Sequence, residues 1–444
     1  MSNNCKCAYC KNDLPFEIPE EIIQSLLNQQ LVLFAGAGIS TETKDIFKET
    51  LFEEVFLDLN EKDDNISFPD LMSKFCRLNN GKQKLLEKIK KRFDYTHQFS
   101  ELYSEASKFH NEVSKFWMIE NIITTNWDDH FEKECNAIPI VTAEDFAFYN
   151  IKQRKVFKIH GSISNYGSII ATKEDYEKCY ESLSTGLIGA NLKTLLATKT
   201  ILFVGYSFRD FDFIKVIELL KKEMGDVFPH FYIISLDDNF PDSINGLKFT
   251  HIKTSGTFFF ENIREHFINE QLILPDELFK TIHHVKYSLI KAQSELHEFY
   301  FEKQKNCSVL FSSIYQDGIS HAIDYLMFKS KTGESYNPLF ILDQIKIYEN
   351  DIKKRFSKSK NYMEIAYVNG YINGLAIPFF FDEIEDFPYH FIFGLDAVSD
   401  KELAFETFEK DIIRHKSSEK YGRQYFKEYL KDGSDMILRH RPFL

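Results

Sequence analysis

The chain has 444 residues, of which 43% are hydrophobic and 27% charged, and its formal net charge is −13. This length suits two or three domains, and the acidic balance gives no overall electrostatic reason to bind nucleic acid. No apolar stretch approaches the roughly 18–20 residues of a membrane span, and the N-terminus lacks the apolar core of a secretory signal, so we expect a cytoplasmic protein without a membrane partner.

Three of the seven cysteines lie close together in residues 1–14, which we treat as a separate segment: Cys5, Cys7 and Cys10. This cluster could bind zinc if a fourth ligand came from elsewhere, because structural zinc sites use Cys and His in sets of four. One Cys-x-x-Cys pair supplies only half of such a site. A loosely ordered terminus is the alternative interpretation.

Residues 31–40, which read LVLFAGAGIS, indicate a nucleotide-binding turn. Five apolar residues run into Gly-Ala-Gly, a pattern typical of a buried parallel strand that ends in a tight turn at a helix N-terminus. Gly36 and Gly38 lack side chains where the backbone must turn or approach a ligand. A plain turn without a ligand is the alternative. The residues whose N–H groups would face a phosphate are Gly36, Ala37, Gly38, Ile39 and Ser40.

A long helical stretch follows this turn. From about residue 44 to residue 118 the apolar residues recur at helical spacing, as at Leu86, Ile89 and Phe93. We interpret the stretch as a helical insertion that packs beside the nucleotide site. A helical subdomain with no role at the site is the alternative.

Further strands end in residues that can take part in chemistry. The apolar runs that open IITTNWDDHFE (122–132), KVFKIHGSI (155–163) and ILFVGYSFRDFDF (201–213) lead into polar or small residues, and FYIIS (231–235) ends in serine. In open α/β sheets, ligands bind beyond the carboxyl ends of the strands. Each run alone could be a core strand followed by a polar loop, but several in one chain favour a site. The residues predicted to form it are Thr125, Asn126, Asp128, His160, Gly161, Gly205, Tyr206, Ser207 and Ser235.

These elements predict an α/β fold over residues 15–265, with a Rossmann-like parallel sheet and a helical insertion, because strands that alternate with helices favour parallel pairing. A helix over 211–224 would end at Gly225. The predicted strands lie near 31–35, 119–125, 138–142, 155–160, 200–205, 231–235 and 250–254.

A second, smaller and mostly helical domain is predicted over residues 280–444, after a boundary at Pro275. Apolar residues spaced three and four apart from Ile282 to Phe299 indicate an amphipathic helix of about 20 residues. The runs LAIPFFF and YHFIFGL, farther along, could be strands. Nothing in this domain indicates an activity of its own, so we expect it to serve in oligomerisation, partner binding or regulation.

The motifs GAGIS, TTNWD, KIHGS and GYSFRD, in this order, resemble the sirtuin-like NAD-binding domain. The resemblance covers roughly residues 15–265 and is greatest to the prokaryotic branch of NAD-cleaving defence proteins, which also has a stretch similar to SIIATKEDY (168–176). Two departures argue against protein deacylation. TETKDIFKETLF replaces the Gly-Ile-Pro-Asp-Phe-Arg loop of deacylases. Cys179 is the only cysteine between Ser162 and Gly205, so the two zinc-binding Cys-x-x-Cys pairs of deacylases are absent.

The resemblance implies a role for each site residue. Gly36–Ser40 would hold the diphosphate, and Gly205, Ser207 and Ser235 would lie at the adenosine end. Asn126 would orient the ribose and the attacking water, and Asp128 would bind the nicotinamide carboxamide. His160, whose reference pKa of about 6.5 suits a base, would contact the ribose hydroxyls and accept a proton.

Simpler structural roles remain open for three of these polar residues. Asn126 could cap the helix that begins at Trp127, since Asn is a good N-cap. His160 could be an ordinary residue of a turn at a strand end. For Asp210, which the resemblance does not assign, an N-cap role is the favoured interpretation.

The implied function is that of an NAD+ glycohydrolase that cleaves the nicotinamide–ribose bond and depletes NAD in bacterial antiviral defence, with NAD+ as substrate and no metal. The alternatives are a non-catalytic NAD or ADP-ribose sensor, and an NAD-dependent deacylase or ADP-ribosyltransferase. Because an unregulated NADase would kill its host, we expect a homo-oligomer with an activating partner, such as a ring-forming ATPase or another defence protein.

Overall fold

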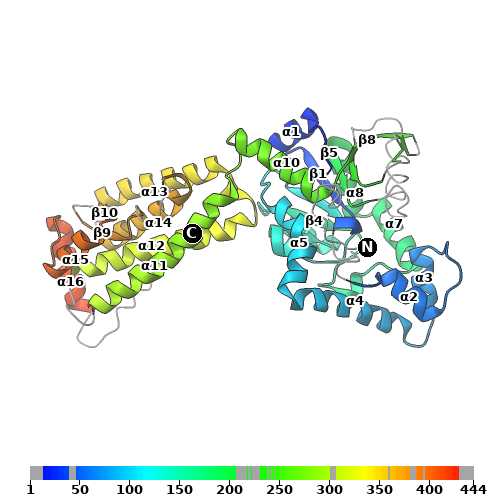
Figure 1. Cartoon of the computed structure of the whole chain (residues 1–444), viewed down its shortest axis with the longest axis horizontal. Helices are drawn as coiled ribbons and strands as arrows, with labels where there is room; N and C mark the ends of the chain where they lie inside the picture. The colour runs from blue at the N-terminus through cyan, green and yellow to red at the C-terminus, as the bar shows by residue number, and fades with distance from the viewer. Residues whose placement is uncertain are drawn as a thin grey trace, which may run out of the picture. The chain divides into compact units, whose positions relative to one another are not determined.

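A computed structural model describes residues 14–39, 47–206, 218, 222, 231–237, 240–241, 243–244, 246–300, 307–358, 361–380, 387–393 and 396–429. The chain divides into two compact units, which are described separately (Figure 1). Unit 1 runs to His266 and includes 331–333, and unit 2 contains 267–330 and the chain from Glu334 onward. Several predicted features lie outside the described residues: Cys5, Cys7, Cys10, Ser40, Ser207, Asp210 and most of the helix over 211–224.

Unit 1 is built on a sheet in which seven parallel strands carry one short antiparallel strand, β7, at the edge. The strand order is β3-β4-β2-β1-β5-β6-β8-β7. The predicted α/β, Rossmann-like parallel fold is confirmed. The strands are β1 Leu31–Ala35, β2 Asn121–Thr124, β3 Ile138–Ile140, β4 Lys155–Lys158, β5 Thr200–Val204, β6 Phe231–Ser235, β7 Ser243–Ile244 and β8 Leu247–Lys253.

Strand β1 is central, and every one of its residues is buried. Its apolar run is continuous because helices cover both faces of a parallel sheet. The last residue, Ala35, pairs with Thr124 of β2 on one side and with Val204 of β5 on the other. The chain therefore changes direction across the sheet at β1, and a ligand site is expected beyond the carboxyl ends at such a switch point.

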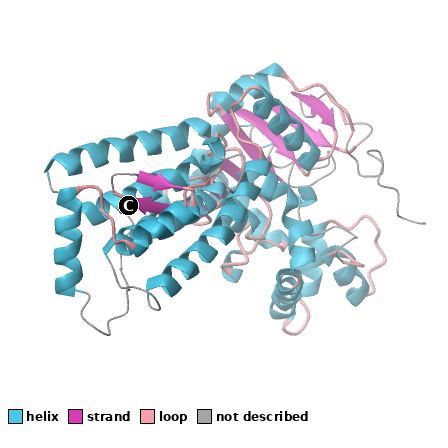
Figure 2. Ribbon diagram, turned by 60° about the vertical axis from the view of Figure 1, so that its left-hand side comes forward, coloured by secondary structure: helices cyan, strands magenta, loops and turns pink. Residues whose placement is uncertain are grey.

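Helices flank this sheet, as the ribbons of Figure 2 show. The predicted insertion consists of four helices: α2 Leu51–Leu59, α3 Phe68–Cys76, α4 Gly81–Gln98 and α5 Ser100–Ser114. The first three share a buried core that includes Val55, Leu71 and Leu85. The other described elements of unit 1 are α1 Glu20–Leu27, η1 Ala37–Ile39, α6 His130–Cys135, η2 Ala143–Phe148, η3 Tyr166–Ser168, α7 Lys173–Thr185, α8 Leu187–Thr198 and α10 Gly256–Asn269, the last of which extends into unit 2.

Unit 2 is mostly helical, as predicted. The apolar residues of α11 lie within the unit, where α11 packs on α12 and α14, and Ile282, Val285 and Leu289 are at most 1% exposed. The stripe on α11 is thus covered without a second subunit. None of the described helices combines the length and hydropathy needed to cross a membrane. The elements are α11 Asp276–Glu298, α12 Cys307–Ser330, η5 Glu334–Tyr336, α13 Pro338–Lys358, α14 Tyr362–Phe380, β9 His390–Ile392, β10 Asp396–Val398, α15 Lys401–Glu409 and α16 Lys416–Tyr429.

One predicted strand of unit 2 is wrong. The described residues of LAIPFFF, 375–380, form the C-terminal part of α14, with Pro378 inside the helix. An uninterrupted apolar run cannot distinguish a buried strand from a buried helix. Here α14 is apolar on most sides because it lies among α11, α12 and α13. The run YHFIFGL does contain a strand, β9, which pairs with β10.

Candidate functional site

The turns that follow β1 and β5 are fastened to each other. The N–H of Gly36 donates to the Val204 carbonyl at 2.9 Å, and the N–H of Gly38 donates to the Gly205 carbonyl at 3.0 Å. A Cβ on Gly36 would lie 2.7 Å from the Gly205 oxygen, and Gly205 itself has φ of +77°. These glycines are therefore required for two backbones to approach closely.

Three of the N–H groups that we expected to face a phosphate are used within the protein. Besides Gly36 and Gly38, Ile39 donates its N–H to the Gly36 carbonyl at 3.3 Å. Of the four described residues of this turn, Ala37 is the one whose N–H makes no such bond. The turn itself is a short 3-10 helix, Ala37–Ile39. A diphosphate would thus meet a turn that is already held in shape, with the exposed Ala37 at its tip.

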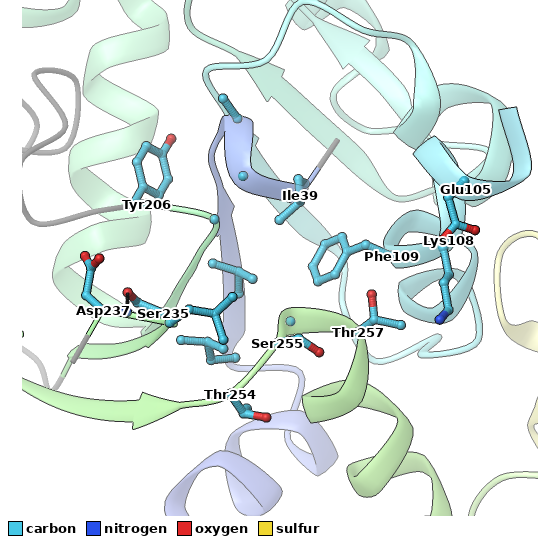
Figure 3. A pocket seen from close by; sticks show the side chains of 17 residues that line it. Ile39, Glu105, Lys108, Phe109, Tyr206, Ser235, Asp237, Thr254, Ser255 and Thr257 are labelled. Carbon is cyan, nitrogen blue, oxygen red and sulfur yellow. Dashed lines mark hydrogen bonds between the residues drawn. The ribbon is translucent and has the colours of Figure 1, made fainter. Parts of the chain in front are cut away.

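A cleft of about 530 Å³ opens beyond the carboxyl ends of β1, β5, β6 and β8 (Figure 3). In Figure 3, Ser235 and Asp237 lie on one side of the β1 turn, and Lys108 on the other. The volume falls within the usual range for a small-molecule site. The predicted site residues that line it are Ala37, Gly38, Ile39, Gly205, Tyr206 and Ser235.

Part of this lining was not predicted from the sequence. Helix α5 contributes Glu105, Lys108 and Phe109, and the turn between β8 and α10 contributes Thr254, Ser255 and Thr257. The residues after β8 could have been predicted, because small polar residues follow this strand as they follow the other strands of the site. The residues of α5 could not, since their positions read as an ordinary amphipathic helix.

Asn126 lies beside the glycine turn. Thr124 is the last paired residue of β2, and Asn126 follows two residues later, 7% exposed. Its Nδ2 donates to the Gly36 carbonyl at 3.1 Å. Helix α6 begins only at His130, with Asp129 as the N-cap residue. The interpretation of Asn126 as a helix cap is therefore wrong, and its side chain instead joins the end of β2 to the turn after β1.

Thr125 and Tyr206 make a second connection across the strand ends. The Thr125 hydroxyl and the Tyr206 hydroxyl are 2.9 Å apart, and Tyr206 also donates to the Ala35 carbonyl at 3.2 Å. Because Tyr206 lines the cleft, the loop after β2 is anchored to the wall of that cleft.

His160 occupies the equivalent position on the neighbouring strand. Lys158 of β4 pairs with Thr124, so His160 and Asn126 are each two residues beyond the same pair of the sheet. The ring of His160 is 2% exposed and packs edge-on against Tyr176 at 4.9 Å. Its carbonyl accepts the N–H of Ile170 at 3.0 Å. The stretch SIIATKEDY thus holds His160 in place, from the backbone and from α7.

Gly161 allows the chain to turn directly after this histidine. Its φ is +85°, and a Cβ there would lie 2.1 Å from the Ser168 carbonyl. The next residue, Ser162, donates its N–H to the Ser168 hydroxyl at 3.0 Å. A residue with a side chain at position 161 would therefore displace the segment that holds His160.

Asp128 is directed toward the protein interior. Its Oδ1 accepts the N–H of His130 at 3.2 Å and lies 3.9 Å from Nε2 of His110, while the Lys158 ammonium donates to its backbone carbonyl. Burial alone would raise the pKa of the Asp128 carboxyl, but the charge of Lys158 and the N–H of His130 are among the contacts that lower it below its usual value. Because burial lowers the pKa of His110 to about 3, that ring is neutral at pH 7. The charge of Lys158 and the N–H of His130 therefore keep Asp128 ionised.

The structure thus divides the predicted residues into two groups. One group lines the cleft, and the other lies at the ends of β2 and β4: Asn126, Asp128 and His160 are outside the cleft lining. Asn126 adjoins the cleft through its bond to Gly36, whereas Asp128 is enclosed by α5 and α6.

Residues 120–252 match the family model of the SIR2-like domain. The chain carries a SIR2-like domain. The matched span starts just before β2 and ends in β8, so it includes Asn126, His160 and much of the cleft wall. The resemblance to the sirtuin-like family that the motif order predicted is confirmed.

Named relatives each match about half of the chain. The NAD(+) hydrolase ThsA of Cytobacillus dafuensis is 28% identical over 217 residues, 46% of this chain and 41% of that protein. The NAD(+) hydrolase ThsA of Bacillus cereus strain MSX-D12 is 27% identical over 241 residues, 51% and 47% of the two chains. Defense-associated sirtuin 2 of Bacillus subtilis is 24% identical over 235 residues, 50% and 22% of the two chains. The chain covers less than half the length of each.

Proposed function

We propose that the SIR2-like domain binds NAD+ across the carboxyl end of β1 and hydrolyses its nicotinamide–ribose bond. The observation that carries the proposal is the shared register of Asn126 and His160. Both side chains follow the same paired position of adjacent strands, and Asn126 bonds to the glycine turn that leads into the cleft. The relatives named NAD(+) hydrolase support this assignment of chemistry.

The two groups of residues suggest how NAD+ would lie. Adenosine would occupy the cleft near Ser235, and the diphosphate would cross the turn at Ala37. Nicotinamide riboside would then reach the ends of β2 and β4, beside Asn126 and His160. This direction agrees with the strand order, in which β5 and β6 lie on one side of β1 and β2 and β4 on the other.

In the proposed reaction, water attacks the anomeric carbon as the bond to nicotinamide breaks. The products are nicotinamide, ADP-ribose and one proton. Asn126 has a donor and an acceptor with which to orient the ribose and the water. His160 would accept the proton that the water loses. Asp128 would bind the nicotinamide carboxamide only if its carboxylate turned from the interior.

The experiment that tests this function is incubation of the pure full-length chain with NAD+, followed by separation of the products. We expect nicotinamide and ADP-ribose in equal amounts. A cyclised product would instead show that a ribosyl hydroxyl group had replaced water. Binding of NAD+ without turnover, with and without candidate partners, would favour a sensor.

We further infer that this activity depletes NAD in the bacterial cytoplasm during antiviral defence, and that the activity is regulated. The word defence is part of the name of one relative. Residues 280–444 would provide the control, through oligomerisation or an activating partner such as a ring-forming ATPase. Since α11 buries its apolar stripe within unit 2, an oligomer would have to use another surface.

Asp237 should make the site prefer NAD+ to NADP+. It lines the cleft two residues beyond the end of β6, and its N–H donates to the Ser235 hydroxyl at 3.0 Å. An acidic residue at such a strand end suits a ribose 2′-hydroxyl and repels a 2′-phosphate. We expect Asp237→Ser to reduce the preference roughly tenfold, about 1.4 kcal/mol. Competition binding of NAD+ and NADP+ measures this. An unchanged ratio of NAD+ affinity to NADP+ affinity would show that the adenosine ribose does not lie beside Asp237.

A further inference from the structure

A group of potential metal ligands joins the end of α4 to the start of α6. His97 is in the last turn of α4, Asp129 is the N-cap of α6, and His130 is its first residue. Their ligand atoms all lie within 4.8 Å of one another. Two imidazoles and a carboxylate are a donor set that zinc uses in proteins.

The strongest observation within this group concerns His130. Its side chain is fully buried, and neither ring nitrogen has a hydrogen-bond partner among the described residues. Buried polar groups are nearly always satisfied, so two unsatisfied nitrogens on one ring need an explanation. The rings of His97, Tyr103 and His110 surround it edge-on, at centroid distances of 5.8, 5.4 and 5.1 Å, and supply contact but no acceptor or donor.

One pair of the ligand atoms already has the spacing of ligands on a tetrahedral ion. Atoms about 2.0–2.1 Å from a tetrahedral zinc are roughly 3.3 Å apart. Nε2 of His97 and Oδ1 of Asp129 are already 3.3 Å apart. Their side chains are 23% and 16% exposed, so an ion can enter from their side while His130 lies behind them.

Lys133 now supplies the positive charge at this position. Its ammonium is 2.9 Å from Asp129 and 3.3 Å from Nε2 of His97. Because this side chain is 44% exposed, it can turn into solvent when a divalent ion arrives. Nε2 of His97 is placed to bond the ammonium or to coordinate a metal, but not both.

We propose that His97, Asp129 and His130 form a zinc site that fastens α6 to α4 behind the loop carrying Asn126. Water would complete the coordination. The ion is structural: it would fix the N-terminus of α6, three residues after Asn126, and would not contact NAD+. It also differs from the N-terminal cysteines, which lie outside the described residues.

The test is zinc and cobalt binding to the metal-free full-length chain. We expect one tightly bound zinc in the Cys5→Ser/Cys10→Ser double variant, with a thermal midpoint of unfolding at least about 2 °C higher than without metal. Cobalt should give the visible bands of nitrogen and oxygen ligands, without the near-ultraviolet thiolate band. Added to this double variant, His97→Ala should abolish both signals, whereas His284→Ala, which removes an exposed histidine on α11, should change neither.

Lys133→Gln gives a second, independent test that does not remove a ligand. Without the competing ammonium, zinc should bind roughly tenfold more tightly. The proposal is overturned if zinc binding survives when His97→Ala is added to the cysteine variant, if it disappears in the cysteine variant itself, or if neither the full-length chain nor Lys133→Gln binds zinc. Lys133 would then be the resident cation of an ordinary ion-pair network.

Discussion

Replacement of Asn126 by alanine should reduce NAD+ cleavage by at least about 10²-fold, because a group that orients both ribose and water acts chiefly in the transition state. The fold should survive. The variant loses the bond from Nδ2 to the Gly36 carbonyl, which costs about 1 kcal/mol, while the backbone bonds of Gly36 and Gly38 to the β5 end remain. Nicotinamide release and thermal unfolding, measured on the same sample, separate the two effects.

His160→Ala should have a similar effect on turnover, about 10²–10⁴-fold, as expected for loss of a general base. Asn111→Ala is the matched control for Asn126→Ala, because it makes the same substitution at an asparagine that is exposed on α5 and lies outside the cleft lining. Turnover by a folded Asn126→Ala protein at the wild-type rate would remove Asn126 from the catalytic site. A loss of turnover in Asn111→Ala would show that the assay reports general damage.

The sheet could be predicted from the sequence because its signals are local. Leu31–Ala35 and Phe231–Ser235 are buried on both faces, so they read as continuous apolar runs bounded by turn residues, and both were predicted to the residue. The small or polar residues after several strands then fixed where a site should be. Parallel pairing brings all these strand ends to one edge, which explains why residues far apart in sequence converge.

What could not be predicted depends on contacts between distant segments. The expected phosphate-facing N–H group of Gly36 donates to the last residue of β5, and that of Gly38 donates to Gly205 in the turn after β5, because two glycine turns meet there. The burial of Asp128 under His110 depends on the placement of α5, which no spacing rule gives. The same is true of LAIPFFF, whose apolar run is explained only by the helices around α14.

Gly370→Ala should overpack the contact between two helices of unit 2 and destabilise the unit by about 3 kcal/mol. Helices α12 and α14 pack closely here, and a Cβ on Gly370 would lie 1.9 Å from the buried Tyr315 carbonyl oxygen. Alanine in a helix normally gains about 1 kcal/mol over glycine, but contact with rigid backbone requires the helices to separate, and overpacking of this kind costs more than that gain. Calorimetry should show a lower unfolding temperature for one transition and an unchanged second transition from unit 1.

Two other glycines serve as comparisons for the effect of Gly370→Ala. A Cβ on Gly374 would meet the Ala322 side chain at 2.6 Å, so Gly374→Ala should have a smaller effect, and Gly167, where the nearest atom is 3.4 Å away, should tolerate alanine. Because the site residues all belong to unit 1, Gly370→Ala also tests whether residues 280–444 control activity. If they do, NAD+ turnover or its response to an activator must change as unit 2 loosens, although the catalytic residues are intact. Unchanged turnover with unit 2 unfolded would assign unit 2 another role.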